Sequence, residues 1–189
     1  MIKNLKLHNV DCLHGTIAVV DNFNDFQEVF KVFMSEPFFE AWTENDMKEE
    51  FEDIKSHGEI LGYYTNFDIA GLLTLIDGAK ESHPVKFANP ERVLYISDVA
   101  TKKEYRGKGY AKDLVNYLMH FLSNQDYYDR AYLRTNLEGS MSEGLFIPYR
   151  FETIRDDNNQ IITQTCEFPR VKPELPETDI RKFLVKKLK

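Results

Sequence analysis

Residues 93–111 read Val-Leu-Tyr-Ile-Ser-Asp-Val-Ala-Thr-Lys-Lys-Glu-Tyr-Arg-Gly-Lys-Gly-Tyr-Ala, and three kinds of local structure meet in this stretch. Its first part is rich in β-branched and aromatic residues, which is the composition and length of a mostly buried strand. From Tyr110 to Leu122, apolar residues recur at spacings of three and four, as on one face of a helix. The stretch therefore predicts a strand, a glycine loop and a helix, in that order.

The loop between strand and helix is Arg106-Gly107-Lys108-Gly109. Glycine lets the backbone take positive φ and approach a ligand closely, and the first turn of a helix offers unpaired N–H groups with a partial positive charge. Such a loop can hold a phosphate or pyrophosphate. The alternative is a tight turn that needs glycine for steric reasons alone. The spacing fits neither the dinucleotide-binding fingerprint nor a P-loop.

Arg106-x-x-Gly109-x-Ala111, preceded by Val-Ala-Thr at 99–101, resembles the acyl-CoA pyrophosphate loop of the GNAT superfamily of N-acyltransferases. In that family (Arg/Gln)-x-x-Gly-x-(Gly/Ala) follows the central strand. The resemblance implies that the pyrophosphate of acetyl-CoA lies on the loop, and that the pantetheine arm pairs with the strand as an added strand would. The cofactor-binding residues it implies are Val99, Ala100, Thr101, Arg106, Gly107, Lys108, Gly109, Tyr110, Ala111 and, after the next strand, Asn136.

Periodicity and turn signals predict further elements along the chain. Strands are expected at 14–20, 59–65, 69–76 and 131–134, and a closing hairpin at 149–154 and 160–168. A first helix is expected to start at the cap-type residues 22–25 and to stop at Pro37, and further helices are expected at 46–56 and 138–147. Residues 77–92 are expected to form a long loop. The order matches the α/β (α+β) layout of the GNAT fold, a mixed, mostly antiparallel sheet flanked by helices. A single domain is expected over 1–168, with a tail at 169–189 that either packs as a short terminal helix or contacts a partner.

The composition limits the classes of function. The length of 189 residues fits one domain with a substantial core. A formal net charge of -7 disfavours nucleic acid and anionic membrane as partners, whereas a local cationic cluster suits an anionic cofactor. That cluster comprises Lys102, Lys103, Arg106, Lys108 and Lys112. The two cysteines and five histidines show no metal-ligand spacing, so no metal is expected, and a reducing cytoplasm is the expected location. The sequence shows no signal-type or membrane-spanning apolar stretch.

The acceptor side is expected near the first two helices. By resemblance, the segment between them borders the acceptor, so Phe38, Phe39 and Trp42 are candidate substrate walls, with plain core packing as the alternative. The helix at 46–56 is expected to carry its carboxylates, Glu50 among them, on an outer face. Beside a pocket these carboxylates would attract an ammonium group, although any solvated helix needs a charged face.

Acyl transfer to an amine needs a base, a donor for the oxyanion and a proton for the leaving thiolate. The resemblance implies direct attack in a ternary complex. Asp98 on the central strand is the candidate catalytic base, or alternatively a structural carboxylate. Many relatives place a tyrosine, the expected general acid, about five residues before a Gly-Phe pair, but here Phe146 precedes Arg150-Phe151 at that spacing. Phenylalanine cannot donate a proton, which leaves Tyr149 and Ser142 as alternatives.

The expected function is therefore an N-acetyltransferase that moves an acetyl group from acetyl-CoA to a primary amine of a small molecule or peptide. A non-catalytic acyl-CoA-binding or sensing module is the alternative, favoured by the phenylalanine at 146. A third alternative is an interaction protein whose glycine loop is only a turn. Because dimers are common in resembling proteins, a homodimer is a further expectation.

Overall fold

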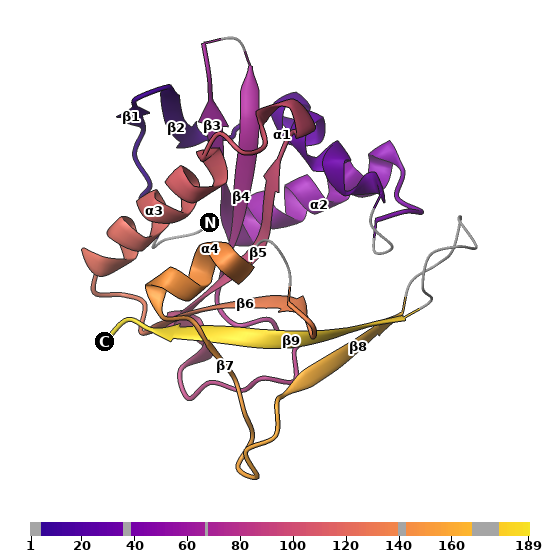
Figure 1. Cartoon of the computed structure of the whole chain (residues 1–189), viewed down its shortest axis with the longest axis vertical. Coiled ribbons are helices and arrows are strands. Elements are labelled where there is room, and N and C mark those ends of the chain that lie inside the picture. Colours follow the sequence, from indigo (N-terminus) through magenta and orange to yellow (C-terminus); the bar gives the residue numbers. More distant parts are fainter. Residues whose placement is uncertain (1–4, 36–38, 67, 140–142, 168–177) are drawn as a thin grey trace.

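The computed structural model describes the chain except for residues 1–4, 36–38, 67, 140–142 and 168–177. Its described strands form one nine-stranded sheet in the order β1-β2-β3-β4-β5-β6-β9, with β7 and β8 both paired to β9. Figure 1 shows this sheet with helices on its two faces. The expected mixed, mainly antiparallel sheet flanked by helices is confirmed, since β5 and β6 are the parallel pair.

The first half of the chain builds an antiparallel meander. It comprises β1 (Val10–Cys12), β2 (Gly15–Val19), β3 (Gly58–Tyr64), β4 (Ile69–Asp77) and β5 (Val93–Thr101). Two helices, α1 (Phe23–Phe30) and α2 (Glu44–His57), connect β2 to β3, and a 3-10 turn η1 (Lys31–Ser35) follows α1. Thr43 and Asp46 form a capping box that starts α2 by pairing two otherwise unbonded N–H groups. The strands β2 to β5 and the two helices confirm the sequence expectation for this half, whereas β1 was not predicted and α1 ends at Phe30, earlier than the expected stop at Pro37.

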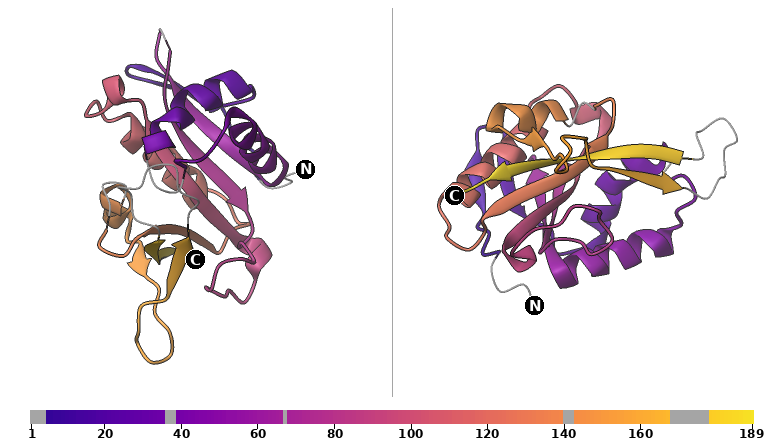
Figure 2. Two further views of the ribbon diagram at one scale, coloured as in Figure 1. Left: turned by 90° about the vertical axis from the view of Figure 1, so that its right-hand side faces the viewer. Right: turned by 90° about the horizontal axis from the view of Figure 1, so that it is seen from below.

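The helices divide the core into two layers. On one face α1 and α2 bury Phe26, Val29, Phe30, Met47 and Ile54 against Ile60, Leu72 and Ala100 of the sheet. On the other face α3 (Tyr110–Ser123) buries Leu114, Val115, Leu118 and Leu122 against Leu73, Leu75, Leu94 and Ile96. Both views in Figure 2 show the helices on opposite sides of the sheet. No helix among the described residues is long and apolar enough to cross a membrane.

The sheet opens between β5 and β6 (Arg130–Asn136). The two strands pair in parallel only from Val93 opposite Arg130 to Ile96 opposite Leu133. Beyond that point β5 keeps β4 as its partner, whereas β6 continues to pair with β9 (Thr178–Lys187). Figure 1 shows the two strands diverging at a steep angle. Residues 97–101 therefore keep one edge that pairs with no described strand.

A β-bulge lies on β5 next to this opening. Leu73 pairs with Val99 and Leu75 pairs with Ile96, so two residues of β5 face Thr74 alone. The hydroxyl of Thr74 accepts a hydrogen bond from the Asp98 N–H at 2.8 Å and donates one to the Asp98 carboxylate at 3.0 Å. Bulges re-aim side chains. Here the bulge fixes Asp98 on the face of β5 where Ala100 meets α1 and α2.

The carboxyl-terminal quarter differs from the expectation. The predicted hairpin is present only near its turn, where Arg155 pairs with Ile161 in an antiparallel bridge and the Ile162 N–H donates to the Ile154 carbonyl at 3.1 Å. Farther from the turn, β7 (Glu152–Thr153) and β8 (Thr163–Glu167) both pair with β9 along one edge instead of with each other. The predicted terminal helix is wrong, because 178–187 is strand β9 inside the sheet. Phe183 and Leu184 are buried on opposite faces of that strand. An apolar spacing of three and four residues fits this two-sided burial as well as it fits a helix.

The two remaining connections are short or irregular. The helix expected at 138–147 is reduced to α4 (Glu143–Phe146) and a 3-10 turn η4 (Ile147–Tyr149), with 140–142 outside the described residues. Residues 78–92 form the expected long loop and contain only the turn η2 (Pro90–Arg92). The base of this loop is tied to β6 because the Arg92 guanidinium donates two hydrogen bonds of 2.8 Å to the Asp129 carboxylate.

Candidate active site

The start of α3 is an open anion cradle. Gly109 is the N-cap with φ +91° and no side-chain cap, and Gly107 has φ +77°. Both values lie in the left-handed region that favours glycine. The N–H groups of 107–111 have no acceptor within the part of the chain that the structure describes. A Cβ placed on either glycine meets nothing within 4 Å, so the space before these groups is open. A helix terminus of this kind suits a phosphate group.

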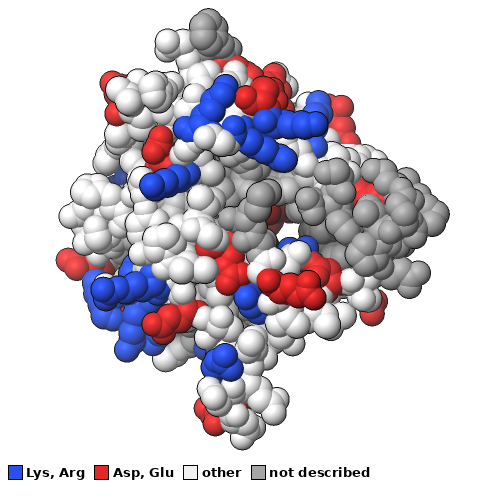
Figure 3. All heavy atoms as spheres, viewed as in Figure 1, with Lys and Arg blue, Asp and Glu red and all other residues white. Residues whose placement is uncertain are grey.

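Basic side chains surround the cradle. Lys103, Arg106, Lys108 and Lys112 are exposed there, and Figure 3 shows Lys and Arg gathered near the start of α3. Lys102 does not belong to this group. It is 8% exposed, and its ammonium contacts Glu28 at 2.7 Å and Asp68 at 2.5 Å, so it ties β5 to α1 and to the β3–β4 turn. The cationic cluster predicted from the sequence is therefore smaller by one residue.

The cradle continues directly into the open edge of β5. Val99, Ala100 and Thr101 lie on the part of β5 that β6 has left, and the Arg106 side chain donates to the Thr101 carbonyl at 3.3 Å. Tyr110 and Ala111 form the first turn of α3. The predicted cofactor residues of 99–111 therefore follow one another along the open part of β5 and the start of α3, although the side chains of Ala100 and Tyr110 are buried in the core. Asn136 lies apart from them at the end of β6, on the other arm of the opening.

The predicted acceptor walls belong to an aromatic cluster. Phe39 and Trp42 contact each other edge-to-face with ring centroids 4.9 Å apart, and the Phe39 ring lies 5.1 Å from that of Phe30 in α1. Both rings are partly buried in the same core as Ala100 of β5. Phe38 lies outside the described residues. Phe39 and Trp42 therefore have the core-packing role that was the alternative in the sequence analysis, and their contact with a substrate stays a prediction.

Glu50 is a candidate site residue that the sequence interpretation missed. It was expected on the outer face of α2, yet it is half-buried, between Met47 and Ile54 on the stripe that faces the sheet. Burial, followed by the negative charge of Asp98, raises the pKa of Glu50 to about 7, although Lys80 opposes this shift. A carboxyl group with a pKa near 7 suits proton transfer at neutral pH. The sequence did contain a signal for this burial, because Glu50 is three residues after Met47 and four before Ile54, and residues at i, i+3 and i+7 share one face of a helix.

No hydroxyl is present where the general acid was expected. Phe146 is 1% exposed and packs edge-on to Phe151 with ring centroids 5.3 Å apart. The Tyr149 hydroxyl donates a hydrogen bond to the Asn116 side-chain oxygen on α3. Ser142 lies outside the described residues. A proton-donating role for Tyr149 therefore stays a prediction.

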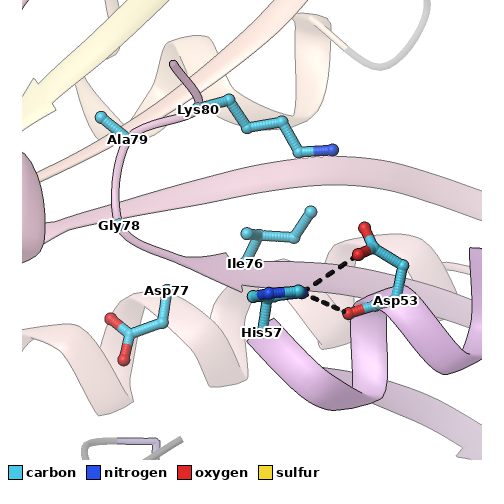
Figure 4. Close-up of a pocket in the computed structure, with 7 residues that line it drawn as sticks. All are labelled: Asp53, His57, Ile76, Asp77, Gly78, Ala79 and Lys80. Carbon is cyan, nitrogen blue, oxygen red and sulfur yellow. Dashed lines mark hydrogen bonds and ion pairs between the residues drawn. The ribbon is translucent and has the colours of Figure 1, made fainter. Parts of the chain in front are cut away.

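A pocket of about 240 Å³ lies between the second half of α2 and the start of the 78–92 loop. It is lined by Asp53, His57, Ile76, Asp77, Gly78, Ala79 and Lys80. Figure 4 shows Lys80 extending across Ile76 toward the side of Asp53, while Asp77 points the other way. The Asp53 carboxylate contacts the His57 ring at 3.1 Å. Within the described ranges, no group of three or more His, Cys, Asp or Glu is arranged to hold a metal ion.

The loop that carries Lys80 is anchored by a buried histidine. His83 is 3% exposed, its Nδ1 lies 3.1 Å from the Tyr132 hydroxyl, and its ring contacts Tyr95 and Phe183. Burial, with smaller contributions from the positive charges of Arg134 and Lys80, lowers the pKa of His83 to about 4. The folded protein therefore holds this side chain neutral.

This histidine makes stability depend on pH. Below the usual histidine pKa of 6.5 the unfolded chain binds a proton at His83, whereas the folded chain does so only near pH 4. We therefore expect the free energy of unfolding to fall by about 3 kcal/mol, through His83 alone, as the pH falls from about 6.5 to 4. Urea unfolding of wild type and His83→Gln at several pH values measures it. Between pH 6.5 and 4, the free energy of unfolding should depend less on pH in His83→Gln than in wild type, whereas a matched change at the exposed His14 should leave this dependence unchanged. The same pH dependence in all three proteins would contradict the assignment.

Comparison with known proteins agrees with this geometry. The fold is similar to an N-acetyltransferase from Staphylococcus aureus Mu50, with a TM-score of 0.65, 14% identity and coverage of 92% of this chain and 99% of that one. It is also similar to a ribosomal-protein-alanine N-acetyltransferase from Brucella melitensis, with a TM-score of 0.64, 12% identity and coverage of 90% of this chain and 98% of that one. A third similar structure is a Bacillus subtilis acetyltransferase in complex with CoA, with a TM-score of 0.59, 12% identity and coverage of 90% of this chain and 97% of that one.

At the level of sequence, a search of curated proteins finds no match. The family model of the acetyltransferase (GNAT) family, however, matches residues 26–146, which is more than half of the 189 residues. The matched segment begins in α1 and ends in α4, so it contains part of α1, all of α2, the open edge of β5 and the glycine cradle. The chain belongs to the acetyltransferase (GNAT) family and is an acyltransferase of the N-acetyltransferase type.

Proposed function

We propose that the protein transfers the acetyl group of acetyl-CoA to a primary amine of a small molecule or peptide, by direct attack in a ternary complex. The observation that carries this proposal is the continuity between the uncapped glycine start of α3 and the unpaired edge of β5. A helix terminus binds phosphate and a strand edge binds an extended amide chain. Coenzyme A contains both groups, joined in one molecule.

The residues present fit this cofactor. The N–H groups of 107–111 would hold the pyrophosphate, and Arg106 and Lys108 would add positive charge. The backbone at Val99 and Thr101 would pair with the pantetheine amides, which supports a thioester placed near the bulge. When bound, acetyl-CoA supplies the activated acetyl group. Asn136 would contact the cofactor from the other arm of the opening.

The acceptor must lose a proton before it attacks. An alkylammonium group has a pKa of about 10, so a base must take this proton in or before the transition state. Glu50 is the base that we propose, with the Asp98 carboxylate beside it favouring a cationic acceptor. A backbone N–H of β5 near Val99 or Ala100 would donate to the oxyanion that forms on the acetyl group.

A second candidate function is a non-catalytic acyl-CoA-binding module. The observation that favours it is the buried Phe146 at the place of the family's tyrosine. Such a module would bind acetyl-CoA without transferring the acetyl group. The loss of one proton donor slows thiolate departure but leaves the base and the oxyanion donor in place, so we rank transfer first.

Calorimetric titration of acetyl-CoA, followed by a thiol-release assay with a panel of primary amines, tests the proposal. We expect saturable binding of acetyl-CoA, much weaker binding of acetyl-pantetheine, which lacks the pyrophosphate, and amine-dependent release of free thiol. Binding without release for every amine would support the non-catalytic module. No binding of acetyl-CoA by the folded protein would overturn both readings.

A further inference from the structure

We propose that Lys102 is a positioning residue for the acceptor side of the site. Its ammonium group holds the second turn of α1 against the end of β5, and α1 in turn places the aromatic cluster that contains Phe39 and Trp42. The inference rests on the proposed function, because it concerns how the same site receives its acceptor. The observation that carries it is one buried ammonium group that two carboxylates from different elements share.

Lys102 is held at its backbone and at its side chain. It directly follows β5, its N–H donates to the Ala70 carbonyl at 2.9 Å, and its Nζ lies 2.7 Å from Glu28 and 2.5 Å from Asp68. A lysine is rarely so buried unless it is paired. Burial lowers the pKa of the ammonium group, but the hydrogen bonds to Asp68 and Glu28 outweigh this effect, so that the pKa is raised overall. The group therefore carries its charge at neutral pH.

The two carboxylates fix different elements. Asp68 belongs to the turn between β3 and β4, which is also closed by a hydrogen bond of 2.8 Å from the Thr65 N–H to the Asp68 carbonyl. Glu28 lies in the second turn of α1, whereas the first turn is held separately, because the Tyr64 hydroxyl donates to the Asp25 carboxylate at 2.9 Å. Loss of the ion pair at Glu28 therefore allows one end of α1 to shift while the other end stays tied to β3.

The end of α1 that would shift carries the aromatic cluster. Phe30 ends α1, two residues after Glu28, and its ring centroid lies 5.1 Å from that of Phe39 and 5.8 Å from that of Trp42. The three rings share one core with Ala100 in the open part of β5. Because protein cores are close-packed, a shift of this end of α1 moves the rings that pack on it. The position of the predicted acceptor walls therefore depends on the ion pair at Glu28.

The cofactor surface is separate from this arrangement. Glu28 and Asp68 already balance the charge of Lys102, whereas the cradle at the start of α3 is surrounded by exposed basic side chains. In addition, α3 packs on the face of the sheet opposite to α1 (Figure 2). We therefore expect loss of the Lys102 ammonium group to weaken the binding of the acceptor and to leave the binding of acetyl-CoA unchanged.

Trp42 provides a test that does not require turnover, because it is the only tryptophan in the chain. Acrylamide quenching of its fluorescence is measured in wild type, Lys102→Met, Glu28→Ala and Asp68→Ala. Lys102→Met and Glu28→Ala should increase the quenching constant, because both release the same end of α1. Asp68→Ala removes a carboxylate from the same ammonium group but keeps the contact with α1, so it should retain the wild-type value. Thermal unfolding checks that each variant is folded.

The kinetic test uses the amine that reacts fastest with wild type in the thiol-release assay. We expect Lys102→Met and Glu28→Ala to raise the KM for this amine about two- to fivefold, the size expected for loss of a partly exposed ion pair. The Kd for acetyl-CoA should not change, and Asp68→Ala should leave both constants at their wild-type values. The double variant Lys102→Met/Glu28→Ala should be no worse than Lys102→Met, because the two changes remove the same contact.

Each other outcome has a defined meaning. Unchanged quenching of Trp42 in folded Lys102→Met overturns the inference. Equal effects of Glu28→Ala and Asp68→Ala also overturn it, because they would reflect a general loss of stability rather than the contact with α1. A raised Kd for acetyl-CoA with an unchanged amine KM would assign Lys102 to the cofactor side. If wild type acetylates no amine, the proposed function fails, and the quenching of Trp42 alone decides whether Lys102 positions the cluster.

Discussion

Replacing Glu50 by glutamine is expected to lower kcat about 10²- to 10³-fold, with little change in the affinity for acetyl-CoA. Glutamine keeps the shape of the side chain but cannot take the proton of the acceptor, and general-base catalysis commonly contributes a factor of this size. Each factor of ten corresponds to about 1.4 kcal/mol of activation free energy. Initial rates at saturating amine and acetyl-CoA, together with calorimetric titration of acetyl-CoA, measure the two quantities separately.

The pH profile distinguishes the base from its neighbour. The pKa of about 7 at Glu50 in the free protein predicts that kcat/KM rises with pH through an inflection near 7, because the deprotonated carboxylate is the active form. Asp98→Asn removes the negative charge that helps to raise this pKa, so the inflection should move to lower pH. Glu50→Gln should abolish it.

A neighbouring carboxylate provides the control. Glu52 is exposed on the same helix, so Glu52→Gln changes the net charge equally without touching the stripe that faces the sheet. It should retain the wild-type rate and inflection. If Asp98→Asn rather than Glu50→Gln abolishes the inflection, Asp98 is the base and Glu50 only tunes it. A Glu50→Gln enzyme within threefold of wild type would remove Glu50 from the reaction.

Much of the fold could be predicted because its signals are local. The strand at 93–101, the glycine loop and α3 each depend on residues adjacent in the sequence, and so does the Thr43 capping box of α2. Periodicity, positive-φ glycines and helix caps act over less than two helical turns. The structure therefore agrees with the sequence wherever an element is specified by its own residues.

The misplaced elements depend on partners that are distant in the sequence. Strand β9 is a strand because β6, β7 and β8 pair with it, and its apolar residues alone fit a helix equally well. Lys102 looked like part of a solvated basic cluster until the fold placed Glu28 and Asp68 beside it. The raised pKa of Glu50 likewise comes from its burial in the fold and from the negative charge of Asp98, which lies on a strand far along the chain.

Gly109→Trp is expected to weaken acetyl-CoA binding by at least about a hundredfold, which corresponds to roughly 3 kcal/mol. The indole would occupy the open space in front of the first turn of α3, where the phosphates are proposed to lie. It would exclude them from the N–H groups of 107–111 without changing any charge. Calorimetric titration with acetyl-CoA measures the loss, and thermal unfolding checks that the variant is folded.

The change to tryptophan also imposes backbone strain, and a second variant separates strain from bulk. Any side chain at φ +91° pays for the left-handed conformation, at roughly 1–2 kcal/mol of stability. Gly109→Ala carries the same strain, but its Cβ meets nothing within 4 Å. We therefore expect both variants to melt at a lower temperature than wild type while only Gly109→Trp loses acetyl-CoA. If alanine weakens binding as much as tryptophan does, the loop conformation rather than the space before it controls the affinity. If neither variant weakens binding, the phosphates lie elsewhere and the cradle at the start of α3 is only a turn.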